Sequence, residues 1–154
     1  HSEIGLLLRN QMKNLHINQT SLALLYAADS YDIQERIEDC YDYIISDRNY
    51  LSTVAYQMMD VNKDWLLMLH QFLKQPDVIF YLNVTVEAAL ERIKKRNDDI
   101  DFFETFENLL EIKSNYEKLI SDGLGVEVCC VETVRKNQTE IVQNVMRIVQ
   151  ERFL

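Results

Sequence analysis

The stretch that decides the fold is residues 43–57, YIISDRNYLSTVAYQ. It opens with a short β-branched and aromatic run, residues 43–45, of the kind that favours a buried strand. The run stops at the charged pair Asp47-Arg48. Beyond this pair, a helix would gather the hydrogen-bonding side chains on one face, because they recur at intervals of three and four residues: Ser52, Thr53, Tyr56 and Gln57. We therefore predict a strand that ends in an acid and a base, followed by a helix with a polar face.

Two interpretations of this junction remain open on residue types alone. Open α/β sheets bind ligands at the carboxyl ends of their strands, so Asp47 and Arg48 could face a ligand. The same two residues could equally form a structural ion pair beside a helix N-cap, because paired charges are often only structural.

The composition restricts the class of protein and its partners. The chain has 154 residues, 47% of them apolar, which is enough for one domain with its own core. A formal net charge of -9 argues against nucleic acid or an anionic membrane as the main partner. The odd number of cysteines favours reduced, buried thiols over a disulfide framework: Cys40, Cys129 and Cys130. With no membrane-length apolar run and no signal-peptide pattern, the protein is expected to be soluble and cytoplasmic.

Strands and helices alternate along the predicted chain. Besides residues 43–46, we expect strands at 78–82 and 126–131. Residues 78–82 are continuously apolar, which is typical of a strand covered on both faces in a parallel sheet. Helices are expected at about 4–12, 22–37, 51–59, 60–74, 85–95, 107–120 and 137–149. The last begins at Asn137, which has capping-box spacing to Glu140. The predicted architecture is one α/β domain, a parallel sheet flanked by helices with right-handed crossovers.

Four cations lie close together in this acidic chain, at Arg92, Lys94, Lys95 and Arg96. Taken alone, they are better explained as cations in the last turn of a helix, where each offsets the helix dipole by about 0.3–1 kcal/mol. Together with Arg48, they supply the positive charge that a phosphoryl group in transfer requires. Tyr26 is by default a core aromatic residue, although its ring could also stack on a base.

At five places the chain resembles thymidylate kinases of the nucleoside monophosphate kinase group. The matching segments, in the family's order, are SEIG at 2–5, LLYAAD at 24–29, DR at 47–48 with STVAYQ at 52–57, QPD at 75–77 before a strand, and residues 88–104. The resemblance implies a P-loop nucleoside monophosphate kinase fold with a lid at about 92–106. It also implies a homodimer that uses Mg²⁺ to transfer the γ-phosphoryl group of ATP to deoxythymidine monophosphate (dTMP).

The resemblance also carries the family's residue roles to positions in this chain. It places Tyr26 on the base and Arg48 on the acceptor phosphate, with Asp47 orienting Arg48 or reaching the metal through water. The other implied substrate contacts are Ser30, Ser52, Thr53, Tyr56 and Gln57, with Thr53 and Gln57 at the base edge and Tyr56 at the sugar. Over the donor phosphates it places Arg92, Lys95 and Arg96. These roles suit phosphoryl transfer, in which the protein contributes mainly positioning and charge compensation.

The chain departs from the family pattern at three places. The glycine-rich phosphate loop with Gly-Lys-Ser/Thr does not occur, since the only glycines are Gly5, Gly123 and Gly125 and none precedes a lysine. In the family, the first strands flank this phosphate loop, so they would be missing as well. A sheet without them would expose unpaired backbone N–H and C=O groups at its edges. We therefore expect the complete protein to have an additional N-terminal segment. Ser30 stands where the family usually has an arginine. Asn49 stands where it has an aromatic residue or histidine, a role that Tyr50 is expected to take.

These departures leave alternative functions open. Ser30 leaves open a kinase for another nucleoside monophosphate. The missing phosphate loop leaves open a non-catalytic nucleotide-binding homologue. A purely structural scaffold is the third alternative, and loss of Arg48 would leave its ligand binding unchanged.

Overall fold

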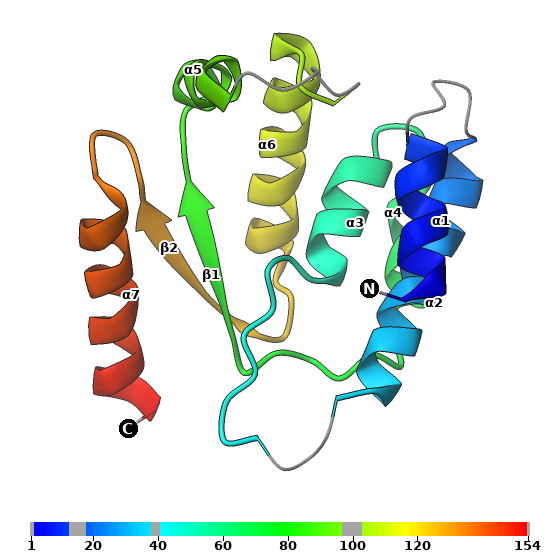
Figure 1. Ribbon diagram of the computed structural model, residues 1–154, viewed down its shortest axis with the longest axis horizontal. Helices are drawn as coiled ribbons and strands as arrows, with labels where there is room; N and C mark the ends of the chain where they lie inside the picture. The colour runs from blue at the N-terminus through cyan, green and yellow to red at the C-terminus, as the bar shows by residue number, and fades with distance from the viewer. Residues whose placement is uncertain (1, 13–17, 38–40, 97–102, 154) are drawn as a thin grey trace. The chain divides into compact units, whose positions relative to one another are not determined.

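The computed structural model describes residues 2–12, 18–37, 41–96 and 103–153. Within these residues lie the helices α1 Glu3–Met12, α2 Gln19–Glu35, α3 Tyr50–Gln57, α4 Lys63–Leu69, α5 Val86–Arg96, α6 Phe106–Asp122 and α7 Gln138–Phe153, and the strands β1 Val78–Asn83 and β2 Glu127–Glu132 (Figure 1). The chain divides into two compact units, His1–Lys74 with Glu111–Leu119, and Gln75–Leu110 with Ile120–Leu154. Helix α6 therefore contributes to both. The expectation of a single domain stays a prediction, and part of the expected lid, 97–102, lies outside the described residues.

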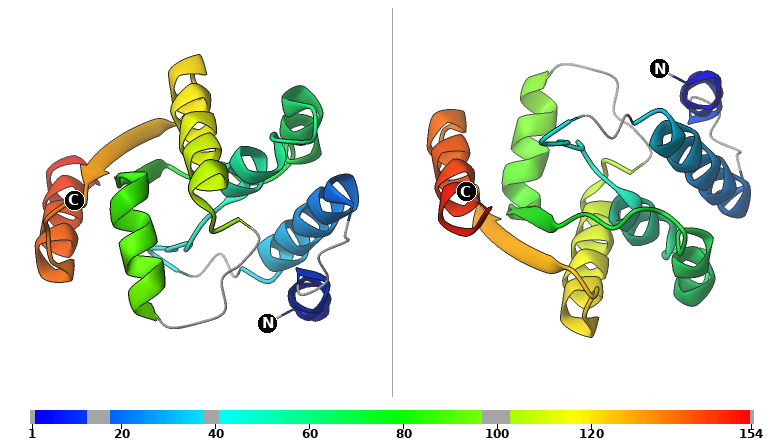
Figure 2. Two further views of the ribbon diagram at one scale, coloured as in Figure 1. Left: turned by 90° about the horizontal axis from the view of Figure 1, so that it is seen from above. Right: turned by 90° about the horizontal axis from the view of Figure 1, so that it is seen from below.

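The first unit is helical, and helix α2 lies at its centre. Helix α2 contacts α1, α3 and α4, and Figure 2 shows α1 and α2 side by side in both views. Three helices of this unit begin at an asparagine whose side chain accepts a hydrogen bond from a free backbone N–H: Asn18, Asn49 and Asn62. The apolar core of this unit is built from α1 to α4 and from the part of α6 that belongs to it: Leu8, Leu22, Ala23, Ala27, Tyr50, Leu51, Val54, Ala55, Leu66, Ile112 and Leu119.

Residues 43–46 are not a strand, so this prediction is wrong. They belong to an irregular segment, coloured cyan in Figure 1, and Ile45 is 96% exposed. A strand needs a neighbour that pairs with its backbone N–H and C=O groups. The sheet in the described part of the chain consists of β1 and β2 alone, and neither pairs with residues 43–46. The apolar pattern of this run does not produce a strand without such a neighbour.

The second unit contains the parallel pair that the sequence predicts. Strands β1 and β2 run in register from Val78 opposite Glu127 to Asn83 opposite Glu132, and α7 packs against β2. The sheet is less buried than the sequence predicts. Leu82 of β1 is 51% exposed, and the apolar residues of α7 are at most half-buried. Successive residues of a strand face opposite sides, so Cys129 is buried whereas Cys130 is exposed, contrary to the expectation of buried thiols. Cys40 lies outside the described residues.

Local capping signals place several element ends where the sequence predicts them. The capping box of α7 is confirmed, because Glu140 N donates to Asn137 Oδ1 at 3.0 Å and Asn137 N donates to Glu140 Oε2 at 2.7 Å. Gly123 and Gly125 adopt positive φ in the turn before β2. The helix expected from residue 60 to 74 is shorter, because His70 ends α4 with i to i-3 hydrogen bonds that tighten the last turn. No helix among the described residues is long and apolar enough to cross a membrane.

Candidate active site

Arg48 occupies a strained position just before helix α3. Its φ of 69° lies in the left-handed region, which residues with a Cβ atom rarely adopt. The backbone is held on both sides of the strained residue. Ser46 Oγ donates to the carbonyl oxygen of Arg48, and Asn49 Oδ1 accepts from Leu51 N at 2.9 Å as the N-cap of α3. Strain of this kind collects at functional sites, because the surrounding structure must hold it in place.

The guanidinium of Arg48 lies over an aromatic ring. Its Cζ atom is 5.3 Å from the ring centroid of Tyr56, which is a cation–π distance. Partial burial disfavours the charged guanidinium, but the neighbouring Tyr56, Tyr116, Tyr26 and Asp47 outweigh this effect and raise the pKa of Arg48. Arg48 is therefore a permanent positive charge, although the residue as a whole stays exposed.

The polar residues of α3 lie at one-turn spacing, as the sequence predicts. Thr53 and Gln57 are 8% and 1% exposed, whereas Ser52 and Tyr56 are half-buried. The Oε1 atom of Gln57 is buried without a hydrogen-bond partner among the described residues. Such an atom costs about 1–3 kcal/mol of desolvation, and each case in a native structure calls for an explanation. The helix thus offers an unused acceptor next to a buried hydroxyl.

Helix α6 adds two residues that the sequence interpretation missed. Tyr116 Oη donates to Ser52 Oγ at 2.8 Å, and Asn115 Nδ2 donates to the carbonyl oxygen of Ala55 at 2.9 Å. The ring of Tyr116 meets the ring of Tyr56 edge-on, with centroids 6.5 Å apart and an interplanar angle of 87°. The sequence predicts Tyr116 only as part of the helix expected at 107–120, with no role in the site. The one available signal was its hydroxyl and the adjacent Asn115, polar groups between the apolar turns of this helix.

The departures from the family pattern have local explanations in the first unit. Ser30 Oγ donates to the carbonyl oxygen of Tyr26 at 2.8 Å, a bond within α2 that supplies no cation. Asn49 serves as the N-cap of α3. Tyr50 is 8% exposed and its ring centroid lies 5.9 Å from that of His70, so its ring belongs to the core. Tyr26 is half-buried on α2.

The predicted donor-side cations lie on α5, in the second unit. Arg92 Nη2 donates to the carbonyl oxygen of Thr133 at 2.9 Å, just beyond β2. Arg96 forms an exposed ion pair with Glu104 at 2.9 Å. Lys94 and Lys95 are exposed in the last turn of the helix, as the dipole argument expects. Arg92 thus also joins its helix to the loop after β2.

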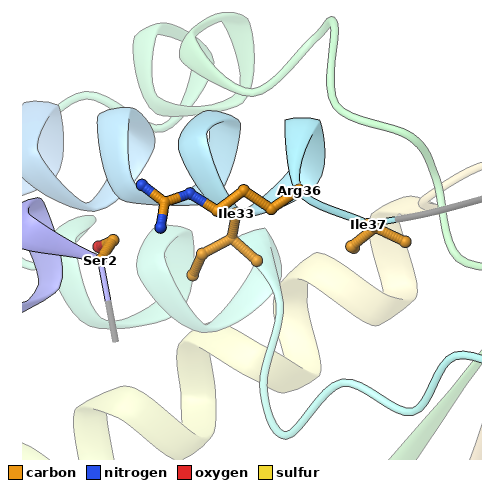
Figure 3. Close-up of a pocket in the computed structure, with 4 residues that line it drawn as sticks. All are labelled: Ser2, Ile33, Arg36 and Ile37. Carbon is orange, nitrogen blue, oxygen red and sulfur yellow. The ribbon is translucent and has the colours of Figure 1, made fainter.

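A pocket of about 390 Å³ opens elsewhere in the first unit, beside α2. Figure 3 shows its lining residues, Ser2, Ile33, Arg36 and Ile37, none of which is a predicted site residue. The guanidinium of Arg36 is already paired with Asp32, four residues earlier on the same helix. No group of three or more histidine, cysteine or acidic side chains that could hold a metal occurs among the described residues.

Comparisons with known proteins identify the family of this chain. The chain matches the model of the family described as "Thymidylate kinase" over residues 1–145. A "Probable thymidylate kinase" of Methanobrevibacter smithii is 33% identical over 144 residues, which cover 91% of this chain and 71% of the relative. Another, from Metallosphaera sedula, is 37% identical over 103 residues, which cover 66% of this chain and 53% of the relative.

A solved structure supports the fold. The thymidylate kinase of Candida albicans matches with a TM-score of 0.76 at 20% identity, over 97% of this chain and 75% of that one. The α/β fold is accordingly of the P-loop nucleoside monophosphate kinase type, and the family match extends over nearly the whole sequence. The chain therefore belongs to the thymidylate kinase family.

Proposed function

We propose that the protein transfers the γ-phosphoryl group of ATP to dTMP and that Arg48 binds the acceptor phosphate. The observation that carries this assignment is the placement of Arg48. In a chain of net charge -9, one permanent cation is held by a strained backbone over the ring of Tyr56, at the position where the family resemblance expects a phosphate ligand. A guanidinium suits this task, because it can donate two parallel hydrogen bonds to a phosphate.

The base and sugar are assigned to helices α2 and α3. Thymine presents one N–H donor on its pairing edge, and the unpaired Oε1 atom of Gln57 is an acceptor that could receive it. Thr53 lies one turn earlier on α3 and supplies a hydroxyl. Tyr26 would lie on the base and Tyr56 beside the sugar, while Ser30 and Ser52 complete the substrate contacts. Together these groups favour a base with a ring N–H on its pairing edge, and cytosine, whose N3 is an acceptor, would leave this bond to Gln57 unmade.

The donor nucleotide is assigned to the cations of α5. Arg92, Lys95 and Arg96 would hold the phosphates of ATP. The exposed pair between Arg96 and Glu104 is weak enough to exchange its carboxylate for a phosphate. Mg²⁺ usually needs only one or two carboxylates from the protein and takes its other ligands from phosphates and water. The exposed carboxylate of Asp47 fits this requirement, and the metal would neutralise charge on the transferring group.

In this mechanism the side chains supply positive charge and position the substrates, and none forms a covalent intermediate. Arg48 would hold the acceptor phosphate, and the cations of α5 would offset the negative charge of the donor phosphates. Asp47 would keep Arg48 oriented. Because the guanidinium stays charged at every physiological pH, acceptor binding should follow the ionisation of the substrate phosphate alone.

We also propose a cytoplasmic homodimer with nucleotides as its ligands. The free thiols of Cys129 and Cys130 are typical of a reducing compartment, and the acidic net charge disfavours nucleic acid and anionic membranes. The dimer rests on the family resemblance. Light scattering on the complete protein would measure its mass, and a monomer at assay concentration would contradict it.

Arg48→Ala in the complete protein tests the assignment. Loss of charge-assisted hydrogen bonds should lower kcat/KM for dTMP about 10- to 100-fold and weaken dTMP binding in calorimetry. Arg147→Ala removes an exposed cation from α7, whose partners among the described residues are on its own helix, and serves as the control with unchanged kinetics. Assays over all nucleoside monophosphates measure selectivity. Unchanged dTMP binding in Arg48→Ala, or no preference for dTMP in the wild type, would contradict the proposal.

A further inference from the structure

We propose that Tyr116 is a positioning residue for dTMP, holding Ser52 and, through Tyr56, the guanidinium of Arg48. This inference rests on the proposed function of Arg48 and extends it to α6, a helix to which the sequence assigned no site residue. Tyr116 itself touches neither phosphate nor base in this role. It acts by fixing the groups that do.

Tyr116 connects to Arg48 through two successive contacts. Its ring edge meets the ring of Tyr56 at a centroid distance of 6.5 Å, and the same Tyr56 ring carries the Arg48 guanidinium at 5.3 Å. A tilt of the Tyr56 ring would move the surface on which the guanidinium rests. Edge-on packing against Tyr116 opposes such a tilt, because aromatic pairs favour this T-shaped arrangement.

The hydroxyl of Tyr116 fixes the direction of a second group. It donates to Ser52 Oγ at 2.8 Å, and burial raises the pKa of Tyr116, so the phenol keeps its proton. Ser52 accepts this bond, and its own hydroxyl proton has no other partner in the part of the chain that the structure describes. Ser52 is thereby set as a donor, which is the role that a phosphate or a base carbonyl requires.

The neighbouring residue keeps Tyr116 in place. Asn115 Nδ2 donates to the carbonyl oxygen of Ala55 at 2.9 Å, so this turn of α6 is tied to the backbone of α3. Ile112 and Leu119, one turn before and after, are 4% and 1% exposed. The turn that carries Tyr116 is thus held against α3 by two hydrogen bonds and by buried apolar neighbours. Residues behind a binding site support it in this way, because they fix the positions of the side chains that contact the ligand.

Tyr116→Phe in the complete protein tests this role, with Tyr31→Phe as the matched control. Tyr31 also donates a phenol hydrogen bond within the first unit, to the carbonyl oxygen of Leu69 at 2.9 Å, but no hydrogen bond in the described part of the chain joins it to Arg48, Ser52 or Tyr56. We expect Tyr116→Phe to raise KM for dTMP about three- to tenfold with KM for ATP unchanged. Tyr31→Phe should lower the melting temperature and leave both KM values unchanged.

A double-mutant cycle with Ser52→Ala tests the route. If Tyr116 acts through Ser52, then Tyr116→Phe should add little to the loss already caused by Ser52→Ala. Additive losses, an unchanged KM for dTMP, or equal increases in both KM values would overturn the proposal.

A measurement on the ligand-free protein separates this proposal from the function of Arg48. We expect the ring current of Tyr56, 5.3 Å from Arg48 Cζ, to shift the NMR resonance of the Arg48 side-chain Nε–H. Tyr116→Leu, which removes the ring edge, should move this resonance toward the value of a free arginine. Tyr31→Phe should not move it. A failure of the proposed function would appear instead as wild-type protein that neither binds nor phosphorylates dTMP. An unmoved Arg48 resonance in Tyr116→Leu would overturn the positioning role in either case.

Discussion

Arg48 joins two features that rarely occur in one residue, a left-handed backbone and a cation stacked on a ring. The left-handed conformation costs roughly 1–2 kcal/mol for a residue with a Cβ atom, and glycine avoids most of this cost. The side chain must therefore supply something that glycine cannot. The guanidinium over Tyr56 is that contribution, which is why strain and function are expected to coincide here.

Substitution of Arg48 by alanine and by glycine should separate strain from function. Both variants lack the guanidinium, so both should lose the same factor in kcat/KM for dTMP. Arg48→Gly relieves the positive φ, so its free energy of unfolding should exceed that of Arg48→Ala by about 1 kcal/mol. Urea denaturation measures the difference. Equal stability of the two variants would show that the loop relaxes and that no strain is stored at this position.

At the scale of elements, the structural features that depend on residues close in sequence were predicted correctly. The capping box of α7 and the one-turn spacing of the polar residues on α3 depend on residues three or four positions apart. The failures depended on distant partners. Residues 43–46 have strand composition, but a strand also requires a paired neighbour. Tyr116 is 64 residues from Ser52, and no local pattern could place the two side chains in contact.

Arg92 and Arg96 lie one turn apart on α5, yet they should differ in what they stabilise. Arg92 donates a hydrogen bond to the carbonyl oxygen of Thr133, a buried residue. Arg92→Ala removes this hydrogen bond and should lower the free energy of unfolding by about 1 kcal/mol. Arg96 is half exposed in its ion pair with Glu104, so Arg96→Ala should cost less than about 0.5 kcal/mol.

Kinetics complete this comparison of the two arginines. Arg96→Ala should raise KM for ATP without a matching loss of stability, since its present partner is exchangeable. Arg92→Lys keeps the charge but not the geometry of the guanidinium, so it should recover only part of the lost stability. An Arg96→Ala variant with wild-type KM for ATP would remove Arg96 from the donor site, and an Arg92→Ala variant of wild-type stability would remove the structural role of Arg92.

At the scale of the whole molecule, the stability of the fold depends on buried polar groups as well as on apolar packing. His70 is 1% exposed, with Nδ1 bonded to the carbonyl oxygen of Leu66 at 2.8 Å and Nε2 without a partner among the described residues. Burial lowers the pKa of His70, only partly opposed by the bond to Leu66. The folded protein thus keeps this histidine neutral where the unfolded chain would already be protonated.

This difference predicts an acid-sensitive fold. A lowered pKa in the folded state means that stability is fully present above the unfolded pKa of about 6.5 and is lost as the pH falls from there toward the folded value. For one proton the slope cannot exceed about 1.4 kcal/mol per pH unit. Urea denaturation between pH 7 and pH 5 should show this loss in the wild type and a flatter profile in His70→Gln, which cannot titrate. A histidine resonance of the folded protein that titrates at or above the ordinary pKa and is lost in His70→Gln would contradict the argument, whatever the stability of the variant.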